Sequence, residues 1–349
     1  MMRNGFAWAL LAWAAIMAVT SPAAAQPREV TPLFTSNEPI RLSIRTDLRQ
    51  ATRSDDATPA TLTIEGAALE THQIELTPRG VSRRRRDICT FPPLRINLPA
   101  RPEAGLLQGQ RRIKLVTHCQ ERASHQQYLL LEYAAYRLYN AITPRSFNVR
   151  LAQIDYYDGD ATEPDVSRYG FLIEDVDDAA ERNGLFEVEA SGFSPSQLSA
   201  ADTARVTLFQ YMIGNLDWAV EAGPAGEDCC HNTRPIGASG DAASNLVPMP
   251  YDFDFSGLVS APYAEPPAQL RVSNVRTRVF RGFCSHNNET RAAAAEFLAA
   301  RSRLEAVLAS IPDLTDRTRS RVTAYLGEFF DDISAPAAVQ ENLLDECLA

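Results

Sequence analysis

Six cysteines and an N-terminal leader constrain the fold of this chain more than any other feature of its sequence. The leader has a positive charge at Arg3, an apolar stretch over 6–19 and a small-residue cleavage site at 23–25. We therefore expect residues 1–25 to be removed and the mature chain to be periplasmic or secreted. Because those locations oxidise thiols, the cysteines predict three disulfides.

The cysteine positions predict one pairing and leave the others open. Cys89 and Cys119 flank a pair of expected strands whose antiparallel pairing would bring the two thiols together. Neighbouring cysteines rarely bond to each other, so Cys229 and Cys230 are expected to reach two different partners. The alternative is a metal site. Its ligands would be Cys229, Cys230 and His231, with His118 and Cys119.

The composition places the chain among globular proteins and excludes several classes of function. Of the 349 residues, 45% are hydrophobic and 22% are charged, which excludes a disordered or low-complexity protein. The formal net charge of −10 argues against nucleic acid as a partner. No apolar stretch after the leader approaches the ~20 residues of a membrane span, so no transmembrane segment is expected after cleavage.

Hydrophobic patterning predicts a β-rich N-terminal segment followed by a helix. Alternating runs at 40–44 and 61–64 predict short strands, and residues 125–140 have the length and composition of a helix. Glu132 lies in the middle of that helix's apolar face, where an unpaired carboxylate would be costly. Glu132 therefore needs a cation, which is either the lysine on the preceding strand or one of many arginines.

Lys114 is the only lysine in a chain that has 33 arginines. Either the base composition of the genome explains this bias, or Lys114 has a role that a guanidinium cannot take. Alternation places Arg112, Lys114 and Val116 on one face of an expected strand. The basic run 83–86 is either a solvated edge or a contact for phosphate.

Carboxylates gather at the end of another expected strand, 247–257. Alternation places Asp252, Asp254 and Ser256 on one face of that strand. Two converging carboxylates suit a hard cation such as Mg²⁺, which completes its coordination with water and substrate phosphate. The alternative is a capped strand end with hydrogen-bonded aspartates.

Five polar residues follow one another in the order of a phosphoryl-transfer site. In such a site a lysine held by a glutamate contacts the α- and β-phosphates, and an aspartate orients the attacking hydroxyl. An asparagine and a second aspartate then hold Mg²⁺. The residues in this order are Lys114, Glu132, Asp217, Asn232 and Asp252.

Four segments in the same order resemble the spore-coat H (CotH) type of atypical protein-kinase-like proteins, and more distantly HipA-type kinases. The segments are YLLLEYAAYRLYNAITPRSFNVRLAQIDYYDG, RYGFLIEDVDD, GNLDW and PYDFDFSG. The resemblance implies an α+β, bilobal atypical-protein-kinase-like fold with a β-rich N-terminal lobe and a mainly helical C-terminal lobe. The expected units are a leader (1–25), a β-rich segment (26–105), a kinase-like N-lobe (106–180), a kinase-like C-lobe (181–335) and a tail (336–349).

The resemblance also implies a role for each residue, with ATP and Mg²⁺ or Mn²⁺ as cofactors. Lys114 would bind the nucleotide phosphates with Glu132 as its ion-pair partner, and Asp217 would be the catalytic aspartate. The chain departs from the family pattern because it lacks a Gly-rich loop before Lys114, where 79–86 could substitute. The expected metal ligands are Asn232, Asp252 and Asp254, and the expected adenine-contacting hinge is Glu174, Asp175, Val176 and Asp177.

Three functions are compatible with these patterns. The first is an exported kinase that transfers phosphate from ATP to a protein or cell-envelope acceptor. The second is a disulfide-stapled pseudokinase or scaffold for an envelope or coat partner. The third is a metal-dependent hydrolase built on Asp217, Asp252 and Asp254. The presence of all five polar residues in one chain favours the first, although exported proteins do not normally meet abundant ATP.

Overall fold

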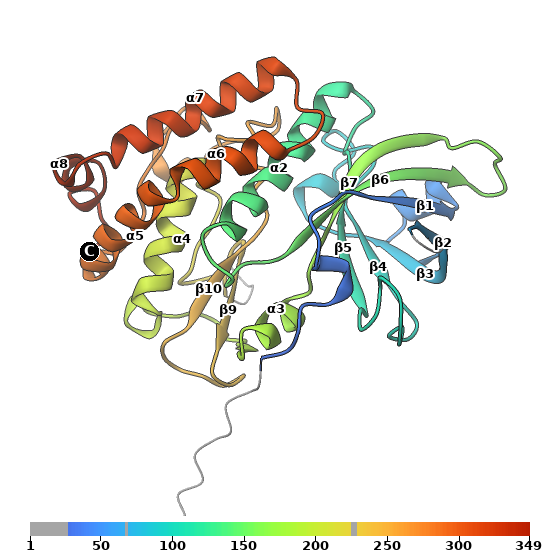
Figure 1. Ribbon diagram of the computed structural model, residues 1–349, viewed down its shortest axis with the longest axis horizontal. Coiled ribbons are helices and arrows are strands. Elements are labelled where there is room, and N and C mark those ends of the chain that lie inside the picture. Colours follow the sequence, from blue (N-terminus) through green and yellow to red (C-terminus); the bar gives the residue numbers. More distant parts are fainter. Residues whose placement is uncertain (1–26, 67–68, 225–228) are drawn as a thin grey trace, which may run out of the picture.

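The strands expected in the first half of the chain form a closed barrel (Figure 1). The computed structural model describes residues 27–66, 69–224 and 229–349, so the expected leader lies outside the described residues. Around the barrel the strands follow the order β1-β2-β3-β4-β5-β7-β6. They are β1 (Ile40–Thr46), β2 (Thr58–Glu65), β3 (Glu70–Pro78), β4 (Leu94–Asn97), β5 (Arg112–Val116), β6 (Val149–Asp158) and β7 (Val166–Ile173).

One parallel pairing closes this barrel. Strand β1 runs parallel to β6, with Ile40 opposite Ala152, whereas the other neighbouring strands are antiparallel. Inward-facing apolar side chains such as Leu42, Leu115 and Leu172 fill the barrel with one core. Because the sheet closes on itself, none of the seven strands presents a long unpaired edge.

The bilobal kinase-like fold predicted from the sequence is wrong. The described chain forms a closed, mixed seven-stranded barrel together with eight α-helices and a second, three-stranded sheet. Strand β4 pairs with β5 across the boundary that was expected near residue 105. Alternation predicts where strands lie and which face is apolar, but it does not specify which strands pair. The parallel contact between β1 and β6 was therefore not visible in the sequence.

Outside the barrel, the described chain forms helices and a small sheet (Figure 1). Helix α2 packs on β6, β7 and α6, and therefore lies between the barrel and the C-terminal helices. The helices are α1 (Leu48–Arg53), α2 (Ala123–Asn140), α3 (Val176–Arg182), α4 (Ala200–Ile213), α5 (Asn287–Ala299), α6 (Arg301–Ser310), α7 (Asp316–Asp332) and α8 (Pro336–Val339). The second sheet has the order β10-β9-β8, with β8 (Phe186–Glu187), β9 (Thr233–Gly237) and β10 (Val247–Pro250).

Several expected helices are confirmed, with different ends. The helix expected over 125–140 is α2, and the one expected over 315–330 is α7. The helix expected over 289–311 is divided into α5 and α6 at Ala300. Within the described residues, no helix is both long enough and apolar enough to cross a membrane.

All six cysteines form disulfides, which fits an oxidising location. The predicted bond between Cys89 and Cys119 is confirmed. The prediction that Cys229 and Cys230 reach different partners is wrong, because they bond to each other. The cysteine-based metal site is therefore excluded, since no thiolate is left to bind a metal. The third disulfide is Cys284–Cys347.

Candidate functional site

The carboxylates expected at the end of a long strand lie in a turn instead. Strand β10 ends at Pro250, and the backbone of Asp252 is left-handed, with φ of 63°. The expected alternation of Asp252, Asp254 and Ser256 on one strand face is therefore wrong. The hydroxyl of Tyr136 on α2 accepts a hydrogen bond of 2.8 Å from the Asp252 backbone N–H, which fixes the turn against that helix.

Three carboxylates meet around one guanidinium at this turn. Glu132 of α2 lies close to Asp252 and Asp254, and each offers an oxygen within 4.8 Å of the others. Arg83, from the loop before β4, lies among them: Nη1 is 2.9 Å from Glu132 Oε2, and Nη2 is 2.7 Å from Asp252 Oδ1. Its Nε lies 3.3 Å from Asp254 Oδ2. We call these four residues the acidic cluster.

The acidic cluster has less positive charge than its carboxylates require. Burial raises the pKa of Glu132 and raises that of Asp254 well above its usual range. Burial also opposes the charge on Arg83, yet the carboxylates outweigh it and raise the pKa of Arg83 well above its usual value. The buried Oδ2 of Asp254 has its ion pair with Arg83 Nε at 3.3 Å but accepts no hydrogen bond from a described residue. These oxygen donors fit an additional hard cation such as Mg²⁺ or Mn²⁺.

Arg83 is the main site residue that the sequence analysis missed. Of the two partners considered for Glu132, the structure shows an arginine and not Lys114. Arg83 is 6% exposed, whereas the three arginines that follow it, 84–86, are exposed. The run of four arginines at 83–86 was compatible with a contact for phosphate, but its sequence does not show which of the four is buried.

Lys114 is on β5 between Ile113 and Leu115, which face the barrel core, so its side chain is on the outer face of the barrel. Its Nζ is 5.4 Å from the ring centroid of Phe147 and 5.2 Å from that of Tyr251. It has no ion pair with any residue in the described part of the chain. Burial, followed by nearby arginines, lowers its pKa to about 8. Those arginines, which together with Lys114 we call the basic group, are Arg79, Arg95 and Arg234.

The basic group and the acidic cluster are neighbours. Lys114 Nζ and the Arg234 Cζ lie 5.2 and 5.9 Å from the ring centroid of Tyr251, the residue before Asp252. These contacts place Lys114 and Arg234 beside the turn that carries Asp252. The site thus combines the basic group, which has an excess of positive charge, with the acidic cluster, which has three carboxylates and one guanidinium.

The loop that carries Asp217 is held against the turn of the acidic cluster. Helix α4 ends at Gly214, whose φ is 61°, and a Cβ there would collide with the hydroxyl of Tyr325. The Gly257 N–H donates to the Gly214 carbonyl at 2.9 Å, and the Leu258 N–H donates to the Ile213 carbonyl at 2.9 Å. Glycine at 214 therefore permits the close approach of the two loops.

Asp217 forms a small polar network with two residues of its own loop. Its Oδ1 lies 2.8 Å from His231 Nε2, and its Oδ2 accepts a hydrogen bond of 3.0 Å from the Asn232 amide. The Asn232 carbonyl accepts a hydrogen bond of 3.0 Å from the Tyr251 N–H. Asp217 and Asn232 are therefore linked through one backbone contact to the turn of the acidic cluster.

The first expected hinge residue has a structural role in this chain. The buried Glu174 carboxylate accepts hydrogen bonds of 2.9 Å from the Asn148 N–H and from Arg182 Nε. These contacts join the end of β7 to the start of β6 and to α3. The carboxylate is therefore satisfied by protein groups.

The other expected hinge residues lie at the start of α3. Asp175 precedes the helix and accepts a hydrogen bond of 3.4 Å from the Asp177 N–H, and Val176 is buried. Asp175 and Asp177 each lie 3.8 Å from Arg112, which stands two residues before Lys114 on β5. The same three residues line a cavity of about 260 Å³.

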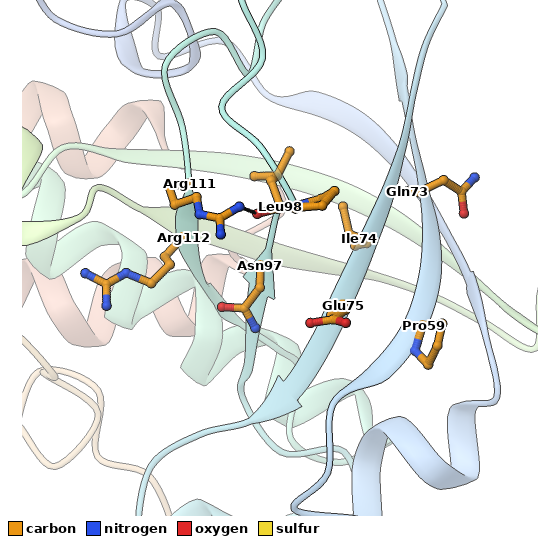
Figure 2. Close-up of a pocket in the computed structure, with 9 residues that line it drawn as sticks. Pro59, Gln73, Ile74, Glu75, Asn97, Leu98, Arg111 and Arg112 are labelled. Carbon is orange, nitrogen blue, oxygen red and sulfur yellow. Dashed lines mark hydrogen bonds between the residues drawn. The ribbon is translucent and has the colours of Figure 1, made fainter.

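Two larger cavities have different lining residues. One, of about 410 Å³, is on the outer face of β2–β5, and Figure 2 shows Glu75, Asn97 and Arg112 reaching it from neighbouring strands. None of the expected site residues lines it. The other, of about 340 Å³, is lined by Asp217 and His231. The second cavity therefore adjoins the candidate site directly.

Comparison of the chain with protein-family models and with curated proteins found no match. The function must therefore be inferred from the side chains of the site.

Proposed function

We propose that the protein is an exported, metal-dependent phosphotransferase that moves the terminal phosphate of ATP to a hydroxyl of a protein or cell-envelope acceptor. The observation that supports this most strongly is the juxtaposition of the acidic cluster and the basic group. A polyphosphate with a divalent cation complements both, because the cation suits the carboxylates and the phosphates suit Lys114 and the arginines. The proposal depends on these side chains and not on a bilobal fold.

Each part of the site has a task in the transfer. Asp252 and Asp254 would hold Mg²⁺ or Mn²⁺, with Asn232 nearby, and the bound metal would neutralise charge on the phosphates. Lys114 would bind phosphate oxygens from the other side. Arg83 would stay paired with Glu132 and neutralise part of the phosphate charge.

Asp217 would act on the acceptor. The acceptor oxygen would form a bond to the γ-phosphorus while the bond from that phosphorus to the bridging oxygen breaks. ADP would leave with the electron pair, and the hydroxyl proton would pass to the Asp217 carboxylate. The contacts of Asp217 with His231 and Asn232 would hold this carboxylate in one orientation.

Thermal unfolding of the oxidised protein tests this proposal. ATP with Mn²⁺ at 100 times the dissociation constant should stabilise the fold by ~2.7 kcal/mol and raise the midpoint by about 4 °C. The shift should disappear in Asp252→Asn. It should persist in Asp241→Asn, because Asp241 is exposed and lies in the connection between β9 and β10. The absence of any nucleotide-dependent shift in the unmodified protein would reject the proposal and favour a scaffold.

A metal-dependent hydrolase is the second candidate, and the contact between Asp217 and His231 favours it. The two groups, 2.8 Å apart, could together take a proton from water. This function predicts that the metal stabilises the fold without ATP, and that Lys114→Arg keeps its full hydrolytic activity. Phosphate release measured with and without an acceptor distinguishes the two candidates.

A further inference from the structure

The cavity beside Asp217 has a composition that specifies its occupant. Asp217 and His231 form one part of its wall, and Leu216, Trp218 and Leu270 give it an apolar surface. A cavity of about 340 Å³ is large enough for one or two amino-acid side chains. The Asp217 carboxylate that would receive the proton of an acceptor thus faces a mainly apolar space.

Arg281 supplies a cation to the same cavity. Its Nη1 donates hydrogen bonds of 3.0 Å to the Leu216 carbonyl and 2.8 Å to the Trp218 carbonyl. Its Nε and Nη2 make no hydrogen bond, and its guanidinium no ion pair, with any described residue. A partly buried guanidinium with unused donors in a cavity wall suits an anionic group of a ligand.

The indole of Trp218 argues against a sugar as the occupant. Trp218 is 5% exposed, and the Arg281 guanidinium lies 4.7 Å from the centre of its ring. Its Nε1 donates to the Asn215 carbonyl at 2.9 Å. The ring is therefore covered and cannot offer an open face on which a sugar could stack.

We propose that this cavity is the acceptor subsite and that it takes a peptide in which a carboxylate side chain lies close in sequence to a hydroxyl side chain. The hydroxyl would face Asp217 and the carboxylate would bind Arg281. Arg281 is bonded to the carbonyls of the residues on both sides of Asp217, so a hydroxyl at Asp217 and a carboxylate at Arg281 would come from nearby positions of one peptide. This inference rests on the proposed phosphotransferase function.

Trp218 makes the inference testable without any catalysis. The other two tryptophans, Trp8 and Trp13, lie in the expected leader, and both are changed to Phe if the purified chain retains them. The fluorescence of Trp218 then reports directly on this cavity. The probes are acetyl-Ala-Ser-Glu-Ala-amide, its neutral analogue with Gln in place of Glu, and its analogue with Ala in place of Ser.

The peptide with both groups should bind at least tenfold more tightly than the Gln analogue, because a hydrogen-bonded charge is lost in that analogue. The Ala analogue should bind nearly as well but accept no phosphate. Gln269→Glu adds a negative charge at the exposed rim and should raise the KM of the acidic peptide about two- to fivefold, with kcat unchanged. Gln73→Glu, which adds the same charge on the barrel, should change nothing.

Two outcomes would overturn the acceptor subsite and leave the phosphotransferase proposal intact. One is equal binding of the acidic and neutral peptides, and the other is no change in Trp218 fluorescence while ATP still stabilises the protein. Selective binding of the acidic peptide without any ATP-dependent stabilisation would support the ligand chemistry of the cavity and refute phosphoryl transfer.

Discussion

Replacing Arg83 by methionine removes the only guanidinium that contacts the three carboxylates of the acidic cluster in the described chain. Arg83 is 6% exposed, and its ion pairs with Glu132 and Asp252 are 2.9 and 2.7 Å long. Removing one partner of a buried charge group typically costs ~3 to 5 kcal/mol, because the remaining charges stay buried without compensation. We therefore expect Arg83→Met to lower the free energy of unfolding by about this amount at pH 8. Urea titration measures it.

The loss of stability in Arg83→Met should grow as the pH rises, which is opposite to the pH dependence of ordinary ion-paired carboxylates. Burial raises the pKa of Glu132 above its usual 4.5 and that of Asp254 well above its usual 3.8. At a pH between the usual pKa of each carboxyl and its raised pKa, the folded state therefore binds more protons than the unfolded state. The free energy of unfolding then falls as the pH rises through the raised pKa. Without Arg83 both values rise further. The deficit of Arg83→Met should then shrink on acidification, by up to ~1.4 kcal/mol per pH unit for each extra proton.

A divalent cation should partly restore Arg83→Met, because it supplies the missing positive charge. Saturating Mn²⁺ should stabilise this variant more than it stabilises the unmodified protein. Arg86→Met is the matched control, since Arg86 is exposed and makes no ion pair in the described chain, and it should change the free energy of unfolding by less than ~0.5 kcal/mol. Equal costs for the two variants, or a cost of Arg83→Met that does not vary between pH 8 and pH 5, would refute the reasoning.

Two further predictions concern Lys114 and the third disulfide. Lys114→Arg should abolish phosphoryl transfer in an activity assay without changing the unfolding midpoint. Because the pKa of Lys114 is about 8, the stabilisation of the unmodified protein by ATP should weaken as the pH rises through that value. Replacing both Cys284 and Cys347 by alanine should lower the free energy of unfolding, measured by urea titration, by ~4 kcal/mol, because their bond closes a loop with a sequence separation of 63. A change below ~1 kcal/mol would show that the loop is ordered without the disulfide.

Local features of the fold were predictable from the sequence because they depend on neighbouring residues. Alternation located β1 and β2, and the composition of 125–140 located α2 with Glu132 on its buried side. Gly214 ends α4 as expected, since a left-handed residue is required there. The bond between Cys89 and Cys119 followed from two adjacent antiparallel strands.

Tertiary structure alone decided the features that depend on distant partners. The parallel pairing of β1 with β6 closes the barrel and joins segments about 110 residues apart. Alternation within a strand does not specify which strand it pairs with. The bridge between Phe283 and Leu348 lies beside the Cys284–Cys347 bond, and with Cys89 bonded to Cys119, Cys229 and Cys230 bond to each other.

The candidate site divides in the same way. The sequence named the polar residues, because a carboxylate on an apolar helix face and a lone lysine are visible in the order of residues. It could not choose the partner of Glu132, because Arg83 is chemically identical to the three arginines that follow it and only the turn before β4 buries it. The residue types were thus determined locally, whereas their contacts were determined by which loops pack together.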